Sequence, residues 1–514
     1  LGVIVRKEFA NHLSGFRFWA GALLAVVLAT AATRLAARDY EIRRERFEAR
    51  IANAAQALRN VDVYSALHPL VVRPPQPLSI LDQGFDSRLG TEVVLQLFEI
   101  PTEAAAANRG NEFLPSGPDI DLTTVVSLVL GLLGLLLTCD ALVGDREDGT
   151  LKATFALPIE RRTLLLGKLL GGLAALALPL AAIVAMALSV LTLAVPEPLA
   201  STDWLLAGAL LLSYLGYLVL ALVGGLTISI FAKSSSSALR IALVLWFAVA
   251  VAVPRAAGAI ARDFTTTELS TKAESRKIAQ INRRHEADLE RAFTRSPLRR
   301  VPSGHTAVSF KSGEGRTVHY RHGSADYYDD LAAYYRFEIR AGLAHAEQVF
   351  ALREQARREL RRNERRAVLA ASISPSFLLE RLAEAFTATS VAEHERFLAT
   401  CREQRLDLIE HIEREHALGS WAWFTSDTPE TLVPWTRYLG LEPSEVGTDR
   451  VLGLLDRLSE PATAARMRAD RAKTRALDLS NLPRFEAPPP SFTTAVLDAT
   501  PFLLAFAALG AAVS

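Results

Sequence analysis

The chain has 514 residues, half of them hydrophobic, and its mean hydropathy of +0.19 is high for a soluble protein of this length. Its formal net charge of +1 gives no basic excess that would favour a nucleic-acid partner. The two cysteines, Cys139 and Cys401, lie far apart in unlike surroundings, which excludes a disulfide framework and argues against a zinc site.

The first 17 residues predict an amphipathic elbow helix (1–17) that leads into the first membrane span. Val5, Phe9, Leu13 and Phe16 fall on one helical stripe, and the polar residues Arg6, Lys7, Asn11 and Arg17 lie elsewhere. A basic start followed by Ala29-Thr30-Ala31 also resembles a signal peptide loosely. The length and patterning of this arm favour a retained helix over a cleaved leader.

Six apolar segments, with their flanks, can cross the roughly 30 Å of bilayer hydrocarbon as helices. We expect membrane spans at 18–37, 122–141, 169–196, 204–232, 239–260 and 491–514. The predicted fold class is therefore an all-α membrane protein with six transmembrane helices. The two long charged regions, 38–121 and 261–490, show mostly helical periodicity, with one short β-like piece at Val308–Tyr320.

Basic residues in the short loops predict the orientation. They occur in the N-terminal arm, in residues 142–168 and in residues 233–240, whereas the loop 197–203 has no cation. We therefore expect a multi-pass protein of the bacterial inner membrane with a cytoplasmic N-terminus. Both long regions, 38–121 and 261–490, would then be extracytoplasmic.

Motifs for catalysis or nucleotide binding are missing from the sequence. Gly167-Lys168 resembles the end of a phosphate-binding loop, but Arg162 stands where that loop needs a glycine. His285-Glu286 lacks the second histidine of a zinc-protease motif, and His411 and His416 are expected to be exposed polar residues. The sequence thus predicts no enzyme, no metal site and no bound cofactor. Gly167 with Gly171 indicates close helix packing, with a subunit interface as the alternative.

A charged segment, residues 142–168, separates the second span from the third. It carries Glu147, then Gly149-Thr150 as a bend or a fresh helix start, and later Pro158 as a helix stop. Arg161-Arg162 and Lys168 then lead into the next span. We expect a compact helical elbow that presents charge to a cytoplasmic partner; an ordinary charged loop is the alternative.

This segment resembles the permease subunits of type-2 ABC exporters. In that family a Glu-x-Gly-Thr-Leu signature precedes a Pro-x-x-Arg element and a Gly-Lys at the start of the third span. The matching residues here are Glu147, Gly149, Thr150, Leu151, Pro158, Arg161 and Lys168.

The resemblance implies that the segment, with Arg162 included, docks on a separate ABC ATPase subunit that holds ATP-Mg. It also implies pairing with a second permease subunit, either the same chain or a paralogue. The large insert between the fifth and sixth spans departs from ordinary members of the family. It is similar to the inserts of a bacterial subgroup, whose sequences Ser374–Glu380 also resembles.

Two functions remain open at this stage. The first is a permease, expected to be an exporter, that couples ATP hydrolysis in its partner to substrate movement across the membrane. The alternative is a mechanical transmitter in which the extracytoplasmic domain acts on an envelope partner and no substrate crosses. Scattered Ser, Thr and Tyr residues in the spans do not decide between them.

Overall fold

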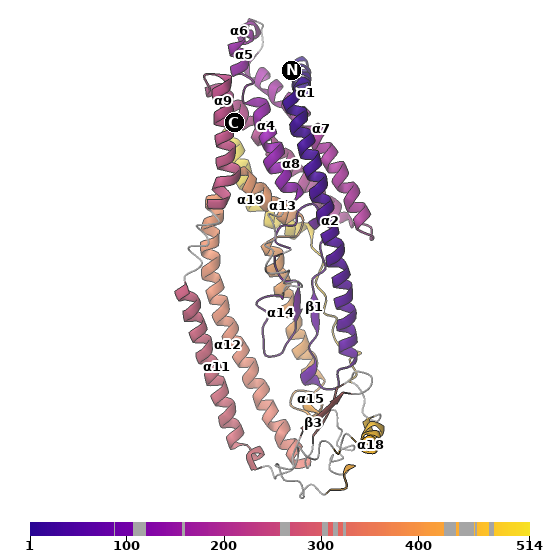
Figure 1. The fold of residues 1–514 in the computed structure, drawn as a ribbon. Coiled ribbons are helices and arrows are strands. Elements are labelled where there is room, and N and C mark those ends of the chain that lie inside the picture. The colour runs from indigo at the N-terminus through magenta and orange to yellow at the C-terminus, as the bar shows by residue number, and fades with distance from the viewer. Residues whose placement is uncertain are drawn as a thin grey trace.

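The computed structural model describes residues 1–86, 88–105, 120–156, 160–256, 268–300, 307–311, 317–321, 325–425, 438–441, 457, 460–471 and 477–513. It is an all-α membrane protein: six of its helices are long and apolar enough to cross a bilayer, and one corresponds to each predicted span. These helices gather in a bundle at one end of the molecule, and long helices run from there into a second, distal domain (Figure 1).

The bundle is built around helices with small and apolar faces. Helix α1 (Gly2–Ser14) precedes α2 (Phe16–Arg59), and the second span consists of α3 (Leu122–Val125), the π turn η3 (Val126–Leu130) and α4 (Gly131–Thr138). The remaining spans are α7 (Arg161–Ala194), α8 (Ser201–Phe231), α9 (Ser235–Phe247) with its π-helical extension η4 (Ala248–Ala252), and α19 (Phe492–Val513). Polar side chains cap two of these helices: Asp121 accepts from the amide of Thr124 at α3, and Ser234 accepts from the amide of Ser237 at α9.

Helix α2 is much longer than the predicted first span. Its apolar half packs in the bundle, where Ala25 and Ala29 are fully buried, and its charged half continues without a break to Arg59. At 1.5 Å per residue its 44 residues extend about 66 Å. The first span and the start of the first long region therefore form one rod.

The distal domain combines both long regions. From the first come η1 (Tyr64–Ala66), η2 (Pro77–Ile80) and the antiparallel pair β1 (Leu70–Val72) and β2 (Glu92–Val94), with Val71 opposite Val93. From the second come α11 (Glu268–Arg295), η5 (Pro297–Arg300), β3 (Ala307–Lys311), β4 (Thr317–Arg321), α12 (Ala325–Ala371), α14 (Val391–Arg414), α15 (Trp421–Phe424) and α18 (Pro461–Arg471). The β-like piece expected at Val308–Tyr320 is this β3–β4 pair.

The two regions share one hydrophobic core, although the sequence treats them as separate inserts. Leu67 and Leu95 of the first region pack with Phe397 and Leu408 of the second. The Arg405 guanidinium, only 2% exposed, donates to the carbonyl of Gln96 at 3.1 Å and to that of Leu97. The two inserts therefore form one domain.

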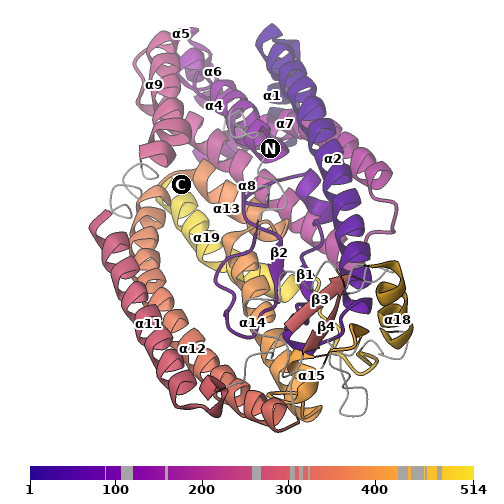
Figure 2. The same ribbon diagram turned by 60° about the horizontal axis from the view of Figure 1, so that its bottom comes forward.

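Helix α13 (Pro375–Phe386) joins this domain to the bundle. It packs against α8 and α19, and Figure 2 shows it beside α19 at the base of the bundle. Long helices α11 and α12 lie side by side at the edge of the distal domain (Figure 2). Cys139 and Cys401 are free and buried in the bundle and the distal domain respectively.

Candidate functional site

The predicted elbow begins where the second span ends. Helix α4 stops at Thr138, and a short helix α5 (Val143–Glu147) starts after a turn. The buried hydroxyl oxygen of Ser229 on α8 accepts from the amides of Leu142 at 2.8 Å and Val143 at 3.1 Å, which satisfies two free N–H groups at the start of α5. The direction of α5 is thus fixed by α8.

Two adjacent charged residues of α5 hold the turn between α8 and α9. The Arg146 guanidinium donates to the carbonyls of Ala232 at 3.4 Å and Ile230 at 3.5 Å, at the C-terminal end of α8. The Glu147 carboxylate accepts from the amide of Ser235 at 3.2 Å and from its hydroxyl, at the N-terminal end of α9. Each charge opposes the partial charge of the helix end that it meets.

Lys168 ties the elbow to the N-terminal helix. Its ammonium lies 2.9 Å from Glu8 Oε1 on α1 and 2.8 Å from Asp145 Oδ2 on α5, and its side chain is 3% exposed. Because a buried charge is strongly disfavoured without a partner, these three residues stabilise one another. Lys168 therefore lies inside the elbow, whereas the expectation was a residue presented to a partner.

Glycines let α1 approach α7 closely. A Cβ on Gly167 would lie 2.5 Å from Ile4 Cγ2, and one on Gly171 would lie 2.6 Å from Glu8 Cβ. Both contacts are too short for any larger residue. These glycines serve helix packing within the chain, as favoured from the sequence.

Between α5 and α6 (Thr150–Phe155) the chain bends at Gly149, whose φ of +74° is a left-handed conformation that glycine adopts without strain. The hydroxyl of Thr150 lies 3.2 Å from the carbonyl oxygen and from a carboxylate oxygen of Asp145. Leu151 is half-buried, and Arg161 and Arg162 are exposed at the start of α7. Pro158 lies outside the described residues.

The structure thus brings Glu147, Gly149 and Thr150 together on one exposed elbow at the end of the bundle, as Figure 1 shows for α5 and α6. Sequence reasoning missed Glu8, Asp145, Ser229 and Ser235, which hold this elbow in place. One signal was available: Glu8 is the single acidic residue among the first 17.

Within the spans, hydroxyl groups are bound internally. Each makes a hydrogen bond to main-chain atoms of the bundle or, for Tyr214, with the hydroxyl of Thr123. The residues concerned are Ser127, Thr138, Ser189, Thr192, Ser213, Tyr214, Tyr217, Thr227 and Ser229. They are accordingly poor candidates for a polar pathway inside one bundle.

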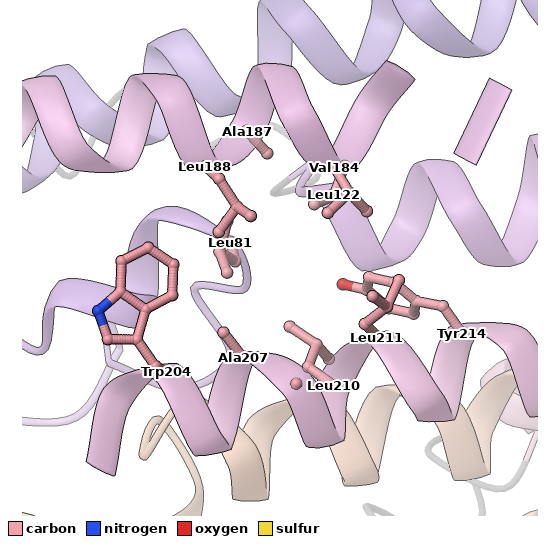
Figure 3. Close-up of a pocket in the computed structure, with 11 residues that line it drawn as sticks. Leu81, Leu122, Val184, Ala187, Leu188, Trp204, Ala207, Leu210, Leu211 and Tyr214 are labelled. Atoms are coloured by element: carbon pink, nitrogen blue, oxygen red, sulfur yellow. The ribbon is translucent and has the colours of Figure 1, made fainter. Parts of the chain in front are cut away.

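An apolar pocket of about 180 Å³ lies between α7 and α8. Figure 3 shows Val184 and Leu188 of α7 facing Ala207 and Leu211 of α8 across it, with Trp204 at one end. Its lining offers apolar contacts and few hydrogen-bonding groups.

No group of three or more His, Cys, Asp or Glu residues suited to a metal occurs in the part of the chain that the structure describes. The expectation that His411 is exposed was wrong: it is 1% exposed, because its face of α14 packs into the distal core. Burial lowers the pKa of His411.

These features define a multi-pass membrane protein with a braced elbow at one end of a six-span bundle. The chain belongs to the ABC-2 family of transporter proteins, since the model of that family, described as "ABC-2 family transporter protein", matches residues 3–289. A probable ABC transporter permease protein, NosY of Pseudomonas aeruginosa, is 39% identical over 152 residues. That match covers 28% of this chain and 52% of the relative, about half of its length.

Proposed function

We propose that the chain is the permease subunit of an ABC transporter and that its elbow receives a separate ABC ATPase subunit. The surface would consist of α5, α6 and the exposed Arg161 and Arg162. One observation carries this proposal: the elbow is fastened at once to α1, α7, α8 and the start of α9, through Lys168, Arg146 and Glu147. A force applied to the elbow therefore reaches four helices.

In this proposal ATP-Mg is held by the ATPase, and the permease binds no cofactor. Closure of the ATPase would favour one arrangement of the spans over another, which is coupling by differential affinity for two states. The elbow would face the cytoplasm, because the short basic loops gather at that end, and the distal domain would be extracytoplasmic.

Pairing with a second permease subunit is supported by the hydrogen bonding inside the bundle. Since the span hydroxyls are already bound within one chain, a polar pathway would run between two subunits, either two copies of this chain or this chain and a paralogue. Export is the direction proposed, by analogy with the family.

Mechanical transmission to an envelope partner remains the second candidate function. It is favoured by the single distal domain that both inserts build, and by helix α13, which connects that domain to α8 and α19. In this alternative the spans move the distal domain and no substrate crosses.

The test is co-purification from membranes, with ATPase activity assayed in the captured material. Changing both Arg161 and Arg162 to Glu should reduce the captured ATPase at least about tenfold, since the surface charge is reversed without disturbing a buried contact. The control is Arg414→Glu, an exposed charge reversal on α14. Equal capture by the double variant and the control would overturn the proposed docking surface.

A further inference from the structure

Helix α13 sits where the distal domain meets three membrane spans. Beyond its packing on α8 and α19, it contacts η4, the π-helical extension of α9. The hydroxyl of Ser374, at its N-cap, donates to the carbonyl of Val249 in that extension at 2.6 Å. Any change in how α13 is seated therefore reaches α8, α9 and α19.

Four carboxyl groups converge on one side of α13 from three parts of the chain. Glu380 and Glu384 lie one turn apart on the helix, Asp82 follows η2, and Asp121 caps α3. A Cβ on Gly84, two residues after Asp82, would lie 3.0 Å from Glu384 Cγ, and α13 also contacts α3, which Asp121 caps. Electrostatic repulsion acts between Asp82 and both Asp121 and Glu384, and between Asp121 and both glutamates. The loop that carries Asp82 is fixed to the end of α13, because the amide of Phe85 donates to the carbonyl of Thr389 at 3.0 Å.

Few positive charges balance this cluster. Arg381 lies 2.5 Å from Glu384, and the exposed Arg88 acts on the same carboxyl. The neighbouring groups on α8 are the neutral phenols of Tyr214 and Tyr217. The charged residue of α19, Asp498, is ion-paired with Arg396 of α14, and η4 contributes no charge. Four ionised carboxylates would thus exceed the two cations that act on the cluster within the described part of the chain.

A second observation points to the missing ligand. Asp82 is 3% exposed, and its Oδ2 has no hydrogen-bond donor among the described residues. The neighbouring Asp121 carboxyl disfavours ionisation of Asp82, and the hydroxyl of Thr123 offsets only part of that effect. A proton on this pair supplies the donor and removes a buried charge.

We propose that Asp82, Asp121, Glu380 and Glu384 form a proton-binding site that seats α13 against the spans and releases its protons as the pH rises. The site lies at the far end of the bundle from the elbow and is independent of ATPase docking. Loss of protons would leave like charges side by side and loosen α13 from α8.

The raised pKa values of the carboxyl groups agree with this behaviour. Burial raises the pKa of Glu380 and of Glu384 from 4.5 to about 7, and burial raises the pKa of Asp82 well above its ordinary value. Because the folded state binds these protons more tightly than the unfolded state, the stabilisation is fully present below the ordinary pKa. It is lost as the pH rises through the folded-state value.

The experiment uses the purified full-length chain in detergent, followed by infrared absorption of protonated carboxyl groups and by thermal unfolding. Between about pH 5 and about pH 8, the wild type should lose a protonated-carboxyl band and several degrees of unfolding midpoint. Glu380→Gln with Glu384→Gln, which keeps shape and removes charge, should lose most of the midpoint shift and a matching part of the band. Glu410→Gln, an exposed acid on α14, should behave as the wild type does.

Two results would overturn the site. One is a wild-type band already absent at about pH 6, since the carboxyls would then be ionised below neutrality. The other is a full midpoint shift in the double variant. If the double variant does not fold, Asp82→Asn alone should still reduce the pH-dependent band, and an unchanged band there would also overturn the proposal.

Discussion

Lys168 and Glu8 stand 160 residues apart in the sequence, and their side chains meet in an ion pair of 2.9 Å inside the elbow. The pair joins the first helix of the chain to the start of the third span, and Asp145 extends it to α5. The elbow is thus joined to the N-terminal helix by a buried ammonium group, the largely buried Glu8 and the partly exposed Asp145.

Lys168→Met should destabilise the protein by about 3 kcal/mol, because it leaves the largely buried Glu8 and the partly exposed Asp145 without their cation. Thermal unfolding of the purified chain measures the loss. Arg162→Met removes an exposed cation one turn and a half earlier and should cost little. Adding Glu8→Gln and Asp145→Asn to Lys168→Met should restore part of the stability; no recovery would argue against charge as the cause.

Gly171→Val should separate α1 from α7, because the new side chain would meet Glu8 Cβ and the backbone of α1. We expect a cost of about 1–3 kcal/mol, typical of overpacking, and faster proteolysis within residues 2–14. Gly224 on α8 has no atom within 4 Å of an added Cβ, so Gly224→Val is the matched control. Equal protease resistance of both variants would contradict the close packing.

Glu147→Lys should lower the ATPase activity that is coupled to the permease, without loss of membrane insertion. The substitution removes the acceptor for Ser235 and places a positive charge at the N-terminal end of α9, which the helix dipole disfavours. ATPase activity of the co-purified complex, with membrane yield as the reference, measures the effect. Asp148→Lys changes the next exposed acid in the same way and should retain more activity. Unchanged hydrolysis in Glu147→Lys would refute a coupling role.

Arg405→Met should loosen the first insert from the second. It removes the buried donors to the carbonyls of Gln96 and Leu97, at a cost of about 2 kcal/mol. Limited proteolysis should then cut residues 96–105 sooner, whereas Arg414→Met at an exposed position should leave the cleavage rate unchanged. Identical digestion patterns would show that the shared hydrophobic core suffices.

The sequence predicted the fold class because long apolar runs and helical periodicity are local properties. It also located the elbow, whose Gly149 and Thr150 act within a few residues of their neighbours. It could not place Lys168 inside the elbow, because the partners that bury it, Glu8 and Asp145, are distant or look like ordinary surface charge.

The packing of the two inserts into one domain could not be predicted from the sequence for a similar reason. Residues 96–102 have no pattern that predicts contact with a helix some 300 residues later, and the arginines of α14 resemble solvated surface charge until they meet carbonyl groups. Whether the exposed elbow residues dock an ATPase stays a prediction.

The unbroken course of α2 turns a small rotation into a large displacement. With a length of about 66 Å, a tilt of about 5° at the bundle would move its far end by about 6 Å. No turn or kink absorbs the motion along these 44 residues, and β1 packs against α2. A change in the tilt of the first span therefore also moves β1.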